Sequence, residues 1–171
     1  MGKGLTVSIL MFLISGLLVL PVAADESLIT FDGGIGVIPV SRAAGAVTPA
    51  GTFLEVVRND VFGTPPGGQP WRIAGLSADV KITGHIKVDG RGLLLAGSNN
   101  IGTNANQMVR ARLFCGGTAH NSGLVPLEAN GDFRIDDVLD PLPLPSSCDN
   151  PALLIVSGGG NWFAAGIPKT E

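Results

Sequence analysis

Apolar and polar residues alternate between positions 78 and 89, and this is the clearest periodic pattern in the chain. One parity holds Ala78, Val80, Ile82, Ile86 and Val88, and the other holds Asp79, Lys81, Thr83, His85, Lys87 and Asp89. A period of two is typical of a strand with one face in the core and one in water. Gly84 interrupts the pattern, so we predict one long strand bent there or two strands that meet there. Asp89-Gly90 is a hairpin signal, and 93–96 is the expected return strand.

Shorter apolar runs predict further strands. They lie at 35–38, 53–57, 108–115 and 153–156, and residues 125–135 are predicted to be two strands joined by an Asn130-Gly131 turn. The Pro-rich segment 63–70 and the Ser-, Asn- and Gly-rich segment 97–107 are predicted to be surface loops. No amphipathic helical pattern follows residue 25, because Gly or Pro interrupts the windows. These features favour an all-β sandwich or partly open barrel of about seven to nine short strands.

The first 24 residues have the pattern of a secretory signal peptide. Lys3 precedes an uncharged apolar run from residue 5 to 20, and Val22-Ala23-Ala24 follows as a small-residue cleavage site. We expect cleavage between Ala24 and Asp25; the alternative is an uncleaved membrane anchor. The mature chain should then comprise a flexible segment (25–33), a single β-sandwich domain (34–168) and a tail (169–171). No other stretch is long and apolar enough to span a bilayer, so we expect a secreted or periplasmic protein.

The chain contains two cysteines, Cys115 and Cys148. In an exported chain an even cysteine count predicts a disulfide and leaves no thiol for nucleophilic catalysis. The closed loop spans 148 − 115 = 33 residues. For a loop of this length, the chain-entropy estimate is about 3–4 kcal/mol of stabilisation.

Charge and motif content exclude several classes of function. Eleven Lys and Arg residues stand against fourteen Asp and Glu, scattered without a basic stripe, so nucleic acid is not an expected partner. The sequence contains no G-x-S-x-G, Walker, H-E-x-x-H or C-x-x-C motif, and Ser157–Asn161 is predicted to be a hairpin turn rather than a phosphate loop. The densest acidic group, Asp132, Asp136, Asp137 and Asp140, lacks the spacing of a calcium loop. We therefore expect no catalytic residues, cofactor or metal.

A possible binding surface is predicted from residues that have no clear role in the strands. Its members are Trp71, Asn99, Asn104, His120 and Trp162. Tryptophans can stack on sugar rings, although core packing is the alternative favoured by the apolar residues after Trp162. Loops such as 97–107 and 116–122, which carry the Asn and His candidates, are common sites of binding residues.

The order of elements from 108 to 156 resembles that of the transthyretin-like, or prealbumin-like, sandwich modules. A strand ends at Cys115, Gly131-Asp132-Phe133 opens a later strand, and a proline-rich loop with Cys148 precedes an apolar strand. The resemblance implies an accessory module of secreted proteins, and the expected fold is an immunoglobulin-like or transthyretin-like β-sandwich. The segments 34–40 and 161–168 resemble those of small secreted bacterial proteins of unassigned function, which implies no residue roles.

These observations predict a structural or interaction module rather than an enzyme, with another protein or a cell-surface component as its partner. One alternative is a carrier that holds a small apolar ligand between its sheets. Ile82, Leu113, Leu154 and Phe163 would fill the interior of a structural module but line a void in a carrier. A second alternative is a hydrolase with a site built from loops, in which His120 is the residue to test.

Overall fold

The computed structural model describes residues 26–42 and 56–169, which contain thirteen β-strands and no helix. The strands are β1 (Ser27–Gly36), β2 (Val40–Arg42), β3 (Val56–Arg58), β4 (Trp71–Arg72), β5 (Gly75–Lys81), β6 (His85–Arg91), β7 (Leu94–Leu95), β8 (Met108–Cys115), β9 (Thr118–Asn121), β10 (Val125–Pro126), β11 (Phe133–Val138), β12 (Ala152–Ser157) and β13 (Trp162–Pro168). The all-β prediction is confirmed. The predicted signal peptide and the cleavage site at Ala24 and Asp25 lie outside the described residues.

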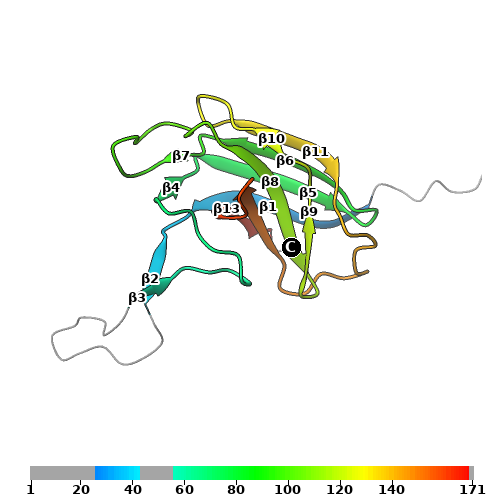
Figure 1. Ribbon diagram of the computed structural model, residues 1–171. Helices are drawn as coiled ribbons and strands as arrows, with labels where there is room; N and C mark the ends of the chain where they lie inside the picture. The colour runs from blue at the N-terminus through cyan, green and yellow to red at the C-terminus, as the bar shows by residue number, and fades with distance from the viewer. Residues whose placement is uncertain (1–25, 43–55, 170–171) are drawn as a thin grey trace, which may run out of the picture.

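The main sheet is antiparallel and curls on itself (Figure 1). Its order is β10-β8-β12-β13-β1-β5-β6-β11, and β9 pairs with β8 beside this path. Asn121 in β9 exchanges two backbone hydrogen bonds, of 2.7 and 2.9 Å, with Asp140, which lies just beyond β11. Because β9 is bonded to β8, this bridge joins the two ends of the sheet. The arrangement is a partly open barrel, and the two-stranded ribbon β2–β3 extends from its body.

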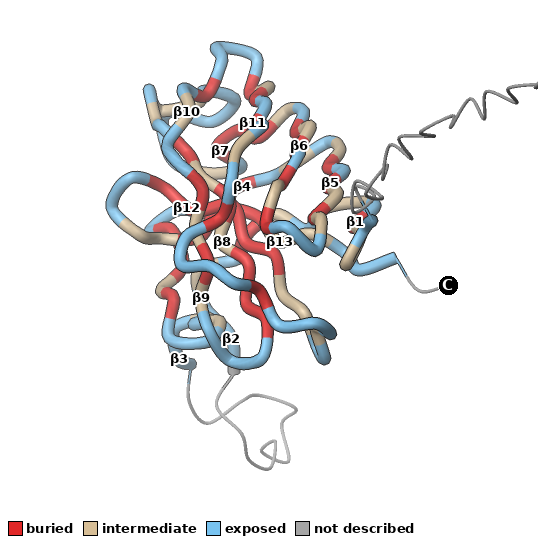
Figure 2. The backbone as a smooth tube through the Cα atoms, turned by 90° about the vertical axis from the view of Figure 1, so that its right-hand side faces the viewer, coloured by how far each residue is buried: buried red, intermediate tan, exposed pale blue. Residues whose placement is uncertain are grey.

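The core lies inside the curled sheet, where alternate residues of each strand meet. Buried and more exposed positions alternate along β5 and β6, as the period-two pattern predicted (Figure 2). Leu113 and Leu154 are among the fully buried side chains, and Phe163 is buried too. Ile82, which we expected inside, is 42% exposed because it lies in the turn between the two strands.

The turn of the β5–β6 hairpin lies at Gly84, so the prediction of two strands meeting there is confirmed. Gly84 has a φ of +87°, a conformation that suits glycine. The turn predicted at Asp89-Gly90 is wrong, since both residues lie within β6. The predicted return strand is shorter than expected: its residues Leu94 and Leu95 form β7, which pairs with β4 instead of β6.

Gly90 faces Phe133 across the β6–β11 ladder, and this contact explains why a glycine stands inside the strand. A Cβ at Gly90 would lie 2.1 Å from two carbons of the Phe133 ring. We therefore expect Gly90→Ala to destabilise the protein by about 1–3 kcal/mol, the usual cost of overpacking a core. Gly75→Ala in the same hairpin is the matched control, because a Cβ there meets nothing within 4 Å. Urea unfolding of both variants measures the difference, and equal midpoints would contradict the prediction.

The predicted flexible segment 25–33 is wrong for residues 27 onward. Residues Ser27–Gly36 form β1, which lies between β5 and β13 near the middle of the sheet. Phe31 is 2% exposed and anchors the strand in the core. The apolar and polar alternation of β1 is hard to recognise in the sequence. A register shift between Phe31 and Gly34 interrupts it, because the residues after the shift no longer continue the two-residue period of those before it. Within the predicted strand 53–57, only Val56 and Val57 are described, and both belong to β3.

The predicted surface loop 63–70 is only partly exposed. Thr64, Pro66 and Gly67 are buried, because this segment lies against β13. Gly67 donates a backbone hydrogen bond to the Trp162 carbonyl, and Trp162 donates one to the Pro65 carbonyl, each of 2.8 Å. Proline and glycine exclude regular structure here, but they do not prevent the backbone from pairing with a neighbouring strand.

The predicted turn at Asn130-Gly131 is confirmed, but its flanking strands do not pair with each other. Glu128 and Asp132 are joined by a backbone hydrogen bond of 2.9 Å, and Gly131 has a φ of +84°. Beyond the turn the strands separate, since β10 pairs with β8 and β11 pairs with β6. The turn therefore connects the two ends of the curled sheet.

Candidate functional site

An open groove of about 530 Å³ lies where three segments distant in sequence come together. Residues 67–69 and Trp71 form one side, and residues from the 97–107 loop form another. The β12–β13 turn and Phe163 complete the lining. A volume of this size is within the range of about 300–1,000 Å³ found for small-molecule sites. The groove is therefore our candidate functional site.

An aromatic pair lines the groove. The Trp71 and Phe163 rings stack with centroids 4.1 Å apart and planes 15° from parallel. The backbone of Val37 holds the strands of both residues in place. Its N–H donates to the backbone carbonyl of Phe163, and its carbonyl accepts from the backbone N–H of Trp71. Gly67 lies against both rings, and a Cβ there would be 2.9 Å from Phe163 and 3.2 Å from the Trp71 indole nitrogen. The absence of a side chain at Gly67 allows its backbone to pack directly against the two rings.

Polar side chains around the aromatic pair are neutral amides and hydroxyls. The lining residues of this kind are Gln69, Ser98, Asn100, Gln107, Ser157 and Asn161. Among the residues that the structure describes, the lining includes no Asp, Glu, Lys, Arg or His. The groove can therefore form hydrogen bonds and apolar contacts, but its side chains supply neither a general acid or base nor a charge.

Trp71 and Trp162 differ in how their indole N–H groups are used. Trp162 donates its Nε1–H to the Asn59 carbonyl at 2.9 Å, and its side chain is 4% exposed. Trp162 is thus a core residue, and its assignment to the binding surface is wrong. Trp71 is also largely buried, but it lines the groove, and its Nε1–H has no hydrogen-bond partner among residues 26–42 and 56–169.

The two predicted asparagines have different positions. Asn104 donates from its Nδ2 to the carbonyls of Leu127 and Glu128, at 2.8 and 3.0 Å. This attaches the 97–107 loop to the turn before β11, so Asn104 has a structural role. Asn99 is exposed next to Asn100 but does not line the groove.

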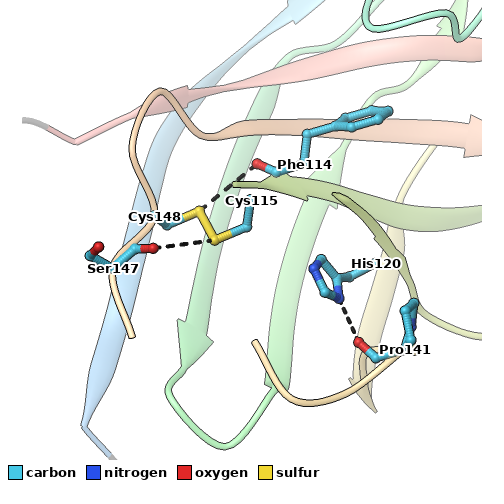
Figure 3. The surroundings of a disulfide bond; sticks show 6 residues. All are labelled: Phe114, Cys115, His120, Pro141, Ser147 and Cys148. Carbon is cyan, nitrogen blue, oxygen red and sulfur yellow. Dashed lines mark hydrogen bonds between the residues drawn. A yellow bond between two sulfur atoms is a disulfide. The ribbon is translucent and has the colours of Figure 1, made fainter. Parts of the chain in front are cut away.

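His120 is buried, so the prediction that it belongs to an exposed binding surface is wrong. It lies in β9 opposite Leu113, a core residue, and is 2% exposed. Its Nδ1 bonds the Pro141 carbonyl, which assigns the proton to Nδ1 (Figure 3). Its Nε2 is buried without a partner in the described part of the chain. A side chain enclosed in this way cannot reach a substrate in solvent.

The predicted disulfide between Cys115 and Cys148 is confirmed (Figure 3). It joins the end of β8 to the proline-rich loop before β12, with Cα atoms 5.0 Å apart. Each sulfur also lies 3.9 Å from a backbone carbonyl oxygen, of Ser147 or Phe114. Since β8 and β12 are neighbours in the sheet, the bond holds the loop that leads into β12 against the end of β8.

The four acidic residues considered for calcium bind separate partners. Asp132 accepts from the Gly92 N–H, Asp136 contacts His85 at 2.6 Å, and Asp137 accepts from Gly123. Asp140 forms the backbone bridge to β9. Within the two described ranges, no three His, Cys, Asp or Glu side chains gather to hold a metal.

Asp137 should make part of the stability dependent on pH. The Gly123 N–H at 2.7 Å and the Val138 N–H at 2.8 Å hold the pKa of this carboxyl below its usual 3.8. A lowered folded-state pKa stabilises the protein above the unfolded-state pKa, and this stabilisation is lost as pH falls through the folded-state value. We expect Asp137→Asn to cost about 1 kcal/mol at neutral pH. The deficit should shrink as the pH falls below 3.8, the usual value for this carboxyl, and through the lower folded-state pKa.

Urea unfolding at neutral and acid pH measures this effect. Asp149→Asn is the matched control, because Asp149 is exposed and has no hydrogen bond or ion pair to the rest of the described structure. A deficit in Asp137→Asn that is the same at both pH values would show that the carboxylate charge is not responsible.

Sequence patterns indicated the 97–107 loop and Trp71 but missed Gln69 and Asn161, which they placed in a loop and a turn. The expectation that Phe163 lies in the core is confirmed, since its side chain is 5% exposed, and it also lines the groove. The sequence feature that could have indicated the groove is the presence of neutral amides in three separate loops. That feature alone does not predict a common site, because the loops come together only in the curled sheet.

Among the described residues, no helix is long and apolar enough to cross a membrane. No family model, curated protein or solved structure matches this chain.

Proposed function

We propose that the protein is an extracytoplasmic, disulfide-stabilised β module that binds a partner through the groove and catalyses no reaction. The observation that carries this proposal is the lining of the groove, in which the aromatic pair Trp71–Phe163 lies among neutral amides and hydroxyls. Such a surface can bind, whereas acid–base or nucleophilic catalysis needs a titratable or activated group.

The Cys115–Cys148 disulfide supports the proposed location, because such bonds persist mainly in oxidising compartments. Together with the predicted signal peptide at 1–24, it favours secretion or export to a periplasm. The resemblance of 108–156 to transthyretin-like modules in secreted proteins agrees with this proposal. The partner class remains the one proposed from sequence, another protein or a cell-surface component.

The packed interior favours an interaction module over a carrier of apolar ligands. Leu113, Leu154 and Phe163, three of the residues expected to fill or line the interior, are buried in one continuous core. The hydrolase alternative loses support because His120 is enclosed in that core.

Site-specific photo-crosslinking tests the proposal. A photoreactive residue replaces Gln69, which is exposed on the groove, and the labelled protein is added to the envelope fraction of its own host. We expect an adduct that excess unlabelled protein prevents. The same label at Lys87, an exposed residue of β6 that does not line the groove, should give no such adduct.

A blocking variant makes the test specific to the groove. Gly68 is exposed and a Cβ there meets nothing within 4 Å, so Gly68→Trp can fill the groove without disturbing the fold. Unlabelled Gly68→Trp should fail to compete, whereas Gly75→Trp, also built on open space, should compete like the wild type. Competition by both variants, or substrate turnover that Gly68→Trp abolishes, would overturn the proposal.

A further inference from the structure

We infer that the ligand of the groove is an uncharged oligosaccharide. This inference rests on the proposed function, because it names the chemical class that the same groove binds. It is drawn from three properties of the lining among the described residues: side-chain donors and acceptors without intramolecular partners, the unpaired indole N–H of Trp71, and the absence of charged side chains.

Unused donors and acceptors lie together in the groove. The carboxamides of Gln69 and Asn100 have no hydrogen-bond partner in the described structure, so each offers a carbonyl acceptor and an NH₂ donor. Gln107 and Asn161 each use the amide nitrogen, toward the carbonyls of Ala105 and Pro66, and retain a free side-chain oxygen. A sugar hydroxyl both donates and accepts, so neighbouring hydroxyls can satisfy both ends of a carboxamide.

The aromatic pair lies at the base of this polar rim, and each side chain is only 5% exposed because the two rings stack on each other. What the pair offers a ligand is therefore the polar N–H at the edge of the Trp71 indole. The Trp71 Nε1–H has no partner within the described ranges and lines the groove, so it is available to a ligand hydroxyl. Gly67, Gly68 and Gly159 also line the groove, and glycine permits a ligand to approach the backbone closely.

Neutrality decides against charged ligands. A phosphate, a carboxylate or an amine that entered the groove would lose hydration without meeting an opposite charge, which is unfavourable. Uncharged oligosaccharides avoid this cost because their polar groups are hydroxyls and amides. A proline-rich peptide is the competing neutral ligand, since such peptides also dock in aromatic-lined grooves, and it is included in the test.

Binding is measured by intrinsic tryptophan fluorescence and isothermal titration calorimetry on the full mature chain. The probes are cellotetraose, maltotetraose, mannotetraose and chitotetraose, with tetragalacturonate as the charged control and decaproline as the peptide. We expect at least one neutral tetrasaccharide to bind at millimolar concentration or below, and tetragalacturonate not to bind.

Matched variants connect binding to the groove. Gln69→Ala combined with Asn100→Ala removes two exposed amides without intramolecular partners in the described structure, and should weaken affinity about tenfold or more. Asn99→Ala changes the neighbouring exposed amide that does not line the groove, and should bind like the wild type. Trp71→Phe keeps an aromatic ring but removes the N–H, and should weaken binding about threefold to tenfold.

The outcomes separate this inference from the proposed function. No neutral tetrasaccharide binding, or binding that the double amide variant leaves unchanged, overturns the saccharide inference. Binding of decaproline alone overturns it too, but leaves a groove that binds a partner. If crosslinking from Gln69 still yields a competable adduct while all sugars fail, the proposed function stands and the ligand class is wrong.

Discussion

Replacing Phe133 with alanine should destabilise the protein by about 3–5 kcal/mol, the usual cost of removing a buried aromatic ring. Phe133 is 1% exposed and lies in β11, where its ring covers Gly90 of β6. Removing the ring leaves a cavity at the edge strand that β11 forms. The loss is a large fraction of the 5–15 kcal/mol that typical domains possess.

Urea or thermal unfolding measures this loss, and Val138→Thr is the matched control. Val138 lies in the same strand but is 50% exposed, so this nearly isosteric change should alter stability by less than about 0.5 kcal/mol. A similar small effect for Phe133→Ala would contradict the role of the ring in the core.

A double-mutant cycle with Gly90 identifies the contact itself. If the cost of Gly90→Ala comes from the clash with the Phe133 ring, that cost should largely disappear in a Phe133→Ala background. The expected coupling is about 0.5–3 kcal/mol, the range for residues in direct contact. Additive effects would show that Gly90 is needed for another reason.

The Phe133–Gly90 contact also explains which part of the fold the sequence could predict. Alternation along β5 and β6 was sufficient to predict those strands, because a two-residue period is a local property. The Asn130-Gly131 pair predicted its turn for the same reason. The partner of β11 was predicted wrongly, because a turn fixes the path of a few residues but not which strand the chain meets afterwards. The pairing with β6 depends on a ring that fits over a glycine 43 positions earlier in the sequence.

The other errors have a similar physical cause. The part of β1 before residue 34 is predicted to be flexible because the register shift after Phe31 breaks the pattern that a regular strand shows. His120 was assigned to a surface loop because its neighbours are Gly, Thr, Asn and Ser, whereas pairing with Leu113 turns it inward. The groove could not be predicted as a unit, since Gln69, Asn100 and Asn161 approach one another only when the sheet curls.

Removing the disulfide should produce the other large effect. We expect the Cys115→Ala, Cys148→Ala double variant to lose about 3–4 kcal/mol, as estimated for a loop of this length. The loop contains β9, β10 and β11, so the crosslink restricts the unfolded chain over the segment that connects the two ends of the sheet. The expected loss is of the same order as that of Phe133→Ala but arises mainly in the unfolded state. It should therefore appear without a large change in the core.

Unfolding in urea with and without reductant measures this contribution. Reductant should lower the midpoint of the wild type to that of the double variant and leave the double variant unchanged. Alanine is preferred to serine because Cys115 is 1% exposed, and a hydroxyl placed there would add the cost of a buried polar group. Wild-type protein whose cysteines react with an alkylating reagent without reductant, or a double variant as stable as the oxidised wild type, would contradict the prediction. Retained binding in the double variant would further show that the crosslink stabilises the barrel without shaping the groove, whose lining includes neither cysteine.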